Sequence, residues 1–256
     1  MFSHQASNLS GVLGIQHGFM GRMGGTSPRP WNYLNASYDV GDIRLRVDEN
    51  RTRIARMFSV SSSNLFTAKQ VHGVTCVRVS AKDDVDSVRK IEADALWTTE
   101  KNLAVGVLTA DCVPVLVASK DGQAVAAIHA GWRGATSGIA VKTIQTMAET
   151  LGLDLDQFVV AIGPCMGFEY YEVGPEVIEA ARKTLSEDDL ANLIRPSTEN
   201  HFFIDLQGVI ERQLKNVGVT NIERTTECTV LNSQHYFSHR LSKGSTGRQL
   251  SVVVAH

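Results

Sequence analysis

Apolar positions along the chain follow two patterns. Runs or alternation of apolar residues are typical of strands, and apolar residues spaced three and four apart are typical of amphipathic helices. Strand-like segments are predicted over 65–80, 93–119, 124–134, 157–167 and 251–256. Within 93–119, two β-branched runs are separated by the polar letters TADC, and Gly73 interrupts the first segment where a bulge would sit.

Helical spacing predicts helices over 48–60, 137–153, 175–185 and 206–219. The first 45 residues are rich in Gly, Ser, Asn and Pro and predict irregular loops on the body of the protein. Several strands follow one another without a helix between them, which argues against a simple doubly wound sheet. We therefore expect a mixed α+β sandwich, and we expect a single domain over 1–256 because repeats and linkers are lacking.

Charge and hydropathy exclude two classes of partner. Lys+Arg number 25 against 27 Asp+Glu, a formal net charge of -2, so no basic surplus exists for a nucleic-acid backbone. The longest apolar run, around 113–119, is much shorter than the roughly 18–20 residues of a membrane helix, and the N-terminus has no export signal. We expect a soluble cytoplasmic protein.

The four cysteines, Cys76, Cys112, Cys165 and Cys228, are dispersed and form no C-x-x-C pair. This spacing does not predict a disulfide framework. Each thiol is therefore interpreted as core filler, metal ligand or nucleophile.

Three residues are candidates for one metal site. His72, Cys112 and His129 each lie at or near the end of a predicted strand, beside a Gly or a polar interruption. Two imidazoles and one thiolate suit zinc, and three protein ligands leave a fourth position open for substrate chemistry. The separations are too long for a local zinc-finger pattern, and taken singly each residue could be a hydrogen-bonded histidine or a buried small thiol.

The motifs around these residues resemble the YfiH/YlmD family. The resemblance rests on QVHG at 70–73, TADCVPVL at 109–116, HAGWRG at 129–134, IGP at 162–164 and YEV at 171–173. LNASYDVGD, ENR, FSHR and TGR extend it across nearly the whole chain. These proteins were once labelled laccase-like polyphenol oxidases and are now regarded as purine nucleoside phosphorylases. The family's zinc ligands fall on His72, Cys112 and His129.

The resemblance implies phosphorolysis of adenosine, inosine, guanosine or S-methyl-5'-thioadenosine, together with adenosine deamination. It also implies a four-layer α/β/β/α fold similar to toxin-type cysteine hydrolases. Three departures bear on substrate preference. The turn reads GPCMG, Tyr170 stands where relatives carry a Cys, and Leu241 follows FSHR in place of a second Arg.

Other polar residues are candidates for substrate contacts. Arg133, at a Gly-flanked helix start, could bind phosphate, or it could pair with a carboxylate. Arg51 and Asn35 form a second candidate pair for substrate binding. Asp111 could protonate the departing purine. Strand alternation would point it away from Cys112, however, so a turn-stabilising carboxylate is the alternative.

The histidine pattern argues against copper chemistry. A multicopper laccase needs many histidines, usually in H-x-H pairs, whereas this chain has 8 and no such pair. Zinc is therefore preferred to copper as the cofactor. His235 and His239 lie four apart, and their aromatic neighbours suggest packing near the site more than a second metal.

Two other functions remain open. Without a metal, Cys112 as nucleophile and His129 as base would make a thiol hydrolase or amidase, and some relatives are connected with cell-wall peptide precursors. A non-enzymatic nucleoside- or metal-binding module is the last alternative. The expected partners are a small nucleoside and phosphate, and the expected assembly is a monomer or homodimer.

Overall fold

The computed structural model describes residues 2–256, in which strands and helices are mixed along the chain as the apolar pattern predicts. The strands are β1 Ser3–His4, β2 Ile15–Met20, β3 Leu65–Phe66, β4 Cys76–Arg78, β5 Ala95–Thr98, β6 Ala104–Thr109, β7 Val113–Ser119, β8 Val125–Ala130, β9 Phe158–Ile162, β10 Glu172–Val173, β11 Ile194–Pro196, β12 Phe202–Ile204, β13 Asn221–Arg224 and β14 Gln249–Ala255. The α-helices are α1 Ser7–Ser10, α2 Arg44–Met57, α3 Val85–Val88, α4 Trp132–Thr136, α5 Ile139–Leu151, α6 Pro175–Ala181, α7 Glu187–Leu190 and α8 Leu206–Asn216.

Two large sheets form the body of the molecule. A six-stranded sheet has the order β13-β9-β7-β8-β5-β4, and a five-stranded sheet has the order β1-β2-β14-β6-β3. Both mix parallel and antiparallel pairs. In the six-stranded sheet β13 and β9 are parallel while β7 and β8 are antiparallel, and in the five-stranded sheet β3 and β6 are parallel while β14 and β6 are antiparallel. The α+β prediction is therefore confirmed.

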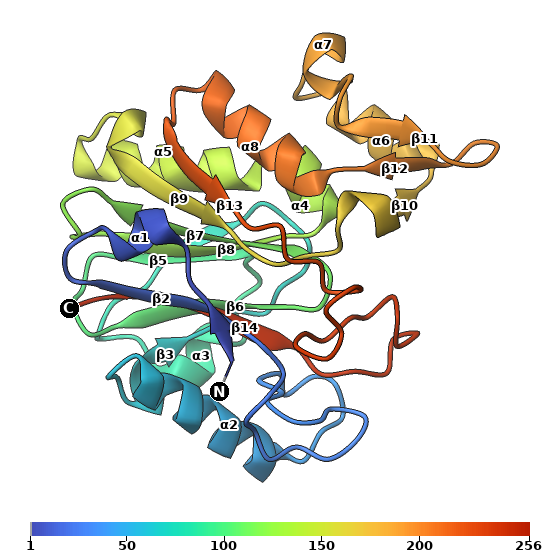
Figure 1. The fold of residues 1–256 in the computed structure, drawn as a ribbon. Helices are drawn as coiled ribbons and strands as arrows, with labels where there is room; N and C mark the ends of the chain where they lie inside the picture. The colour runs from blue at the N-terminus through green and yellow to red at the C-terminus, as the bar shows by residue number, and fades with distance from the viewer. Residues whose placement is uncertain (1) are drawn as a thin grey trace.

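The two large sheets stack face to face, with α5 and α8 over the outer side of the six-stranded sheet and α2 beyond the five-stranded one (Figure 1). Buried apolar clusters lie at each of these contacts. A small third sheet, β10-β12-β11, projects beside α6 and α7 (Figure 1). No helix within residues 2–256 has both the length and the apolarity that crossing a membrane requires.

The strongest periodic segments form the predicted elements. Helix α5 buries Ile139, Ile144 and Met147 on one face, and α8 buries Val209 and Leu214 in the same way. Every residue of β7 and of β8 is buried, as expected for strands with an apolar layer on both faces.

Two segments differ from the prediction. The N-terminal region is not wholly irregular, because β2 is a central partner of β14. Its alternation is masked by a buried His17, which accepts a hydrogen bond from the Ala6 N–H at 2.9 Å, and by Gly18, where a Cβ would lie 3.1 Å from the Phe58 ring. The segment 65–80 also keeps only β3 and β4, since its middle is a loop.

The chain crosses from one large sheet to the other twice at the loops that carry candidate residues. Residues 110–112 join β6 of the five-stranded sheet to β7 of the six-stranded sheet. Residues 67–75 join β3 to β4 in the same sense. The two crossings deliver Cys112 and His72 to one place, beside His129 near the end of β8.

Candidate active site

The three predicted ligands converge. One potential ligand atom from each of His72, Cys112 and His129 lies within 4.8 Å of the others, and Cys112 Sγ is 3.8 Å from His72 Nε2. Tetrahedral zinc, with bonds of about 2.3 Å to sulfur and about 2.0 Å to nitrogen, places these atoms about 3.5 Å apart. The donor set and its spacing therefore fit a zinc ion after a small inward shift.

Two unusual backbone conformations aim the ligands. His72 has a φ of 61° and Asp111, next to Cys112, has a φ of 88°, a region that residues other than Gly seldom adopt. The turn at His72 is anchored by Gln70, whose amide donates to Leu108 O and accepts from Leu108 N, both at 2.7 Å. His72 and Cys112, at or beside these turns, both line the same cavity as His129.

Asp94 holds both histidines, and nothing in the sequence drew attention to it. Its carboxylate is buried, contacts His129 Nδ1 at 2.7 Å, and accepts the backbone N–H groups of His72 at 2.9 Å and Gly73 at 2.7 Å. The contact at Nδ1 leaves Nε2 of His129 free for a metal. Such a carboxylate orients a metal-bound histidine and increases its basicity.

Gly131, in the HAGWRG motif, makes room for the cluster. A Cβ there would lie 2.4 Å from His72 Cδ2 and 3.4 Å from Cys112 Sγ. Since such a contact is far inside van der Waals distance, any larger residue would displace His72. The glycine is required by close approach and not by its backbone angles.

The electrostatics favour an ionised thiol. Burial opposes ionisation of Cys112, but His129 and His72 outweigh it and lower the thiol pKa to about 6. Burial also disfavours the charged form of His129, yet Cys112 and Asp94 raise its pKa to about 9. A thiolate is the form that binds metal or attacks an electrophile.

A cavity of about 320 Å³ opens onto the cluster. This volume lies within the range of small-molecule pockets. Its lining comprises Ser37, Asp39, Val40, Ala68, Lys69, Gln70, His72, Leu108, Thr109, Ala110, Cys112, His129, His239 and Arg248. His239 and Arg248 belong to the FSHR and TGR motifs, which thus reach the same cavity as His72, Cys112 and His129.

Asp111 is engaged elsewhere. Its Oδ1 accepts from Thr229 Oγ1 at 2.6 Å, its Oδ2 accepts from the Arg240 N–H at 2.7 Å, and it is absent from the cavity lining given above. These contacts favour the turn-stabilising role of Asp111 over catalysis.

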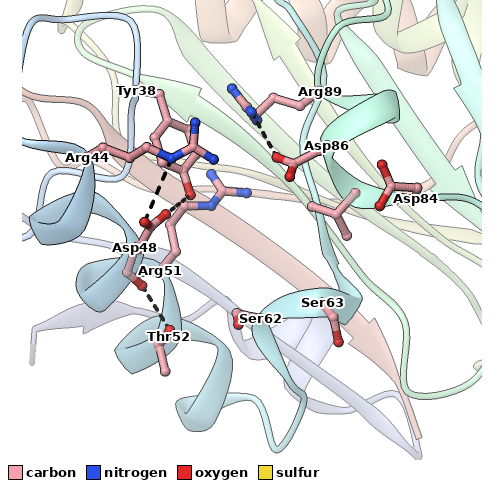
Figure 2. A pocket seen from close by; sticks show the side chains of 11 residues that line it. Tyr38, Arg44, Asp48, Arg51, Thr52, Ser62, Ser63, Asp84, Asp86 and Arg89 are labelled. Atoms are coloured by element: carbon pink, nitrogen blue, oxygen red, sulfur yellow. Dashed lines mark hydrogen bonds and ion pairs between the residues drawn. The ribbon is translucent and has the colours of Figure 1, made fainter.

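Neither Asn35 nor Arg51 is among the residues that line the cavity. Buried Asn35 accepts from the Arg248 N–H at 2.9 Å and donates to Asp42, so it supports the backbone that carries Arg248. Arg51 lines a different hollow, where its guanidinium lies 5.4 Å from the Tyr38 ring (Figure 2). Substrate binding by these two residues stays a prediction, and their contacts favour a structural role.

Arg133 is not brought to the cluster's cavity either. It is exposed on α4 and stacks on the ring of Trp132 at 4.3 Å. The residues that the sequence reasoning did not single out are Asp94, Gly131 and Arg248, whereas His239, expected to pack near the site, lines the cavity. The HAGWRG and TGR motifs contained a signal for two of them, whereas Asp94 is a lone acidic residue before a strand.

Three convergent nitrogen and sulfur donors lie beside a ligand-sized cavity, an arrangement whose donor set fits a metal ion. The family profile described as multi-copper polyphenol oxidoreductase laccase matches residues 16–256. The chain belongs to this family, whose members include YfiH and YlmD, as the motifs predict.

The relatives cover nearly the whole chain. A purine nucleoside phosphorylase of Corynebacterium glutamicum is 36% identical over 92% of this chain and 92% of its own, and one of Pseudomonas aeruginosa is 34% identical over 91% and 90%. The crystal structure of YlmD from Geobacillus stearothermophilus is 30% identical and covers 98% of this chain and 94% of its own, with a TM-score of 0.92.

Proposed function

We propose that this protein is a zinc-dependent purine nucleoside phosphorylase acting on adenosine, inosine, guanosine and S-methyl-5'-thioadenosine, with adenosine deaminase activity. The observation that carries the proposal is the meeting of His72, Cys112 and His129 at a cavity that also contains the basic residue Arg248. The names of the relatives support the same activity. We also propose that the fold is a four-layer α/β/β/α sandwich similar to that of toxin-type cysteine hydrolases.

The residues have distinct tasks in the proposed reaction. His72, Cys112 and His129 would hold the zinc, which supplies a Lewis acid when bound. Asp94 orients the His129 imidazole and holds the backbone turn that carries His72. The cavity walls hold nucleoside and phosphate together and exclude water. In the reaction a phosphate oxygen bonds to the ribose anomeric carbon, the bond to the purine nitrogen breaks, and its electron pair leaves with the base, which takes up a proton.

Product analysis tests the proposal. The zinc-loaded protein is incubated with inosine, adenosine and methylthioadenosine, with and without inorganic phosphate. The expected result is free base and ribose 1-phosphate (or its methylthio analogue) only when phosphate is present, and loss of turnover on chelation. Free ribose without phosphate, or no turnover of any nucleoside, would contradict it.

A second function is favoured by one observation. Cys112, His129 and Asp94 also have the arrangement of a thiol hydrolase, namely a nucleophile, a base and a carboxylate that orients the base. The pKa of the Cys112 thiol is lowered, as such a nucleophile requires. As a hydrolase or amidase acting on cell-wall peptide precursors, the protein would stay active in chelator and form an acyl-enzyme on Cys112. Intact-mass analysis during turnover of a peptide substrate distinguishes the two functions.

A further inference from the structure

The FSHR and TGR motifs place His239 and Arg248 in the cavity, although neither residue belongs to the group of three candidate metal ligands. Arg248 precedes β14, and Gln249, its neighbour, pairs with Thr109 at the end of β6. His239 reaches the same cavity from the preceding loop, and Arg248 Nη2 lies 3.3 Å from His239 Nδ1. Thr109, His239 and Arg248 therefore line the cavity beside Cys112 from three separate segments.

Arg248 has hydrogen-bonding capacity to spare. A guanidinium carries five N–H donors. Its contacts within the described chain are Thr246 O at 3.0 Å, Gly247 O at 2.9 Å and His239 Nδ1. No carboxylate of residues 2–256 lies within ion-pairing distance of it. A half-buried cation that faces a cavity without a counter-ion suits an anionic ligand.

Thr109 supplies an independent sign of a ligand. It is 2% exposed and lines the cavity, and its hydroxyl has no hydrogen-bond partner among residues 2–256. Buried hydroxyls are normally paired, so this one needs a partner from outside the chain. A hydroxyl can donate to an anion oxygen.

The remaining charges of the lining leave the guanidinium free. Lys69 is paired with Glu92 at 2.8 Å, and Asp39 is exposed. The cavity therefore offers one unpaired fixed cation close to the metal cluster.

We propose that Arg248, His239 and Thr109 form the subsite that holds the attacking phosphate beside the zinc ligands. This inference rests on the proposed phosphorylase function and assigns one substrate to part of its cavity. The guanidinium and hydroxyl donate to phosphate oxygens, and His239 adds a donor when its imidazole carries a proton on Nε2. The nucleoside then occupies the remainder of the cavity.

The experiment compares zinc-loaded wild type with Arg248→Gln, Arg248→Lys and Thr109→Val. Inorganic phosphate binding is measured by isothermal titration calorimetry, and the KM values for phosphate and inosine are measured in phosphorolysis. Arg248→Gln is expected to raise the Kd and KM for phosphate by about tenfold or more, with the KM for inosine changed less than about twofold. Arg248→Lys should recover part of the loss, and Thr109→Val should raise both phosphate constants by about threefold.

Matched controls keep the result interpretable. Arg78→Gln alters an exposed arginine on β4 that stacks on Trp97, and it should leave every constant unchanged. Equal phosphate constants in wild type and Arg248→Gln, both zinc-loaded, would overturn the subsite, as would a tenfold effect of Arg133→Gln in its place. If the wild type turns over no nucleoside, the proposed function fails, but weaker phosphate binding by Arg248→Gln would still support the subsite.

Discussion

Two hollows of the same volume, each about 320 Å³, receive side chains from the segment 37–40 and differ in how their charges are balanced. The hollow around Tyr38 contains Arg44, Arg51 and Arg89 together with three aspartates (Figure 2). Its Arg89 pairs with Asp86 at 2.8 Å. In the cavity beside Cys112, by contrast, Arg248 has no such partner among residues 2–256.

The difference shows that a count of arginines does not identify an anion site. In the Tyr38 hollow the guanidiniums of Arg44, Arg51 and Arg89 lie 4.6–5.4 Å from one aromatic ring. Arg44 and Arg89 are paired with aspartates, and Arg51 donates to three neutral oxygens. Tyr38 thereby contacts two arginines of α2 and the arginine that follows α3. Because these guanidiniums already have partners within the chain, we expect them to attract an anionic ligand only weakly. The Cys112 cavity instead combines a cation that has no ion-pair partner and a hydroxyl that has no hydrogen-bond partner within residues 2–256, beside three side chains of metal-ligand type.

The largest expected effect separates the carboxylate that supports His129 and the His72 turn from a carboxylate of the Tyr38 hollow. Asp94→Asn should weaken zinc binding by about 10–100-fold, because the neutral amide no longer holds His129 and the His72 turn with a charge. Competition with a chelating dye measures the affinity. Asp86→Asn, in the Tyr38 hollow, is the control and should bind zinc like the wild type; equal affinities for all three proteins would refute the role of Asp94.

Arg51→Met tests whether the Tyr38 hollow is structural. The buried guanidinium donates to Ala36 O, Leu65 O and Thr67 Oγ1, so its removal should lower the free energy of unfolding by about 2–4 kcal/mol. Urea denaturation measures this change. Arg44→Met, at a largely exposed position, should cost far less. A loss below about 0.5 kcal/mol for Arg51→Met would show that the hollow does not need this residue.

The pH dependence of Cys112 is the third test. The thiolate is the form of cysteine that iodoacetamide alkylates. Because the pKa of Cys112 is lowered to about 6 in the folded protein, alkylation of the zinc-free protein should be fast at pH 7. Below pH 6 the rate should fall about tenfold per pH unit. Peptide mass spectrometry separates Cys112 from Cys76, whose pKa burial raises to about 11. A midpoint near 8.5 would contradict the proposed electrostatics.

The smallest effect is expected at Arg89. Because Asp86, its ion-pair partner, is largely exposed, Arg89→Gln should change the free energy of unfolding by at most about 1 kcal/mol. The KM for phosphate should stay within about twofold of wild type. A tenfold increase in this KM would mean that the Tyr38 hollow takes part in phosphate binding, and the contrast between the hollows would be lost.

The sequence predicts the helices and strands in which buried positions recur regularly. The periodicity of α5 and α8 and the unbroken apolar runs of β7 and β8 are direct consequences of their contacts. Sequence reasoning missed the place of β2, because the buried His17 is stabilised by a backbone donor eleven residues away that no local pattern reveals.

The site was only partly accessible for a related reason. Family motifs selected His72, Cys112 and His129, yet their meeting depends on two sheet-crossing loops and on left-handed turns at His72 and Asp111. Asp94 acts through three-dimensional contacts alone. The contrast between Arg51 and Arg248 is likewise set by which acceptors surround each guanidinium in the fold.

The central claim is that His72, Cys112 and His129 hold one zinc ion, and calorimetric titration of zinc into metal-free protein tests it most directly. The account predicts one zinc per chain for the wild type and an affinity reduced by more than about 100-fold in Cys112→Ala. Equal zinc affinity in the two proteins, or no binding by a folded wild type, would contradict it.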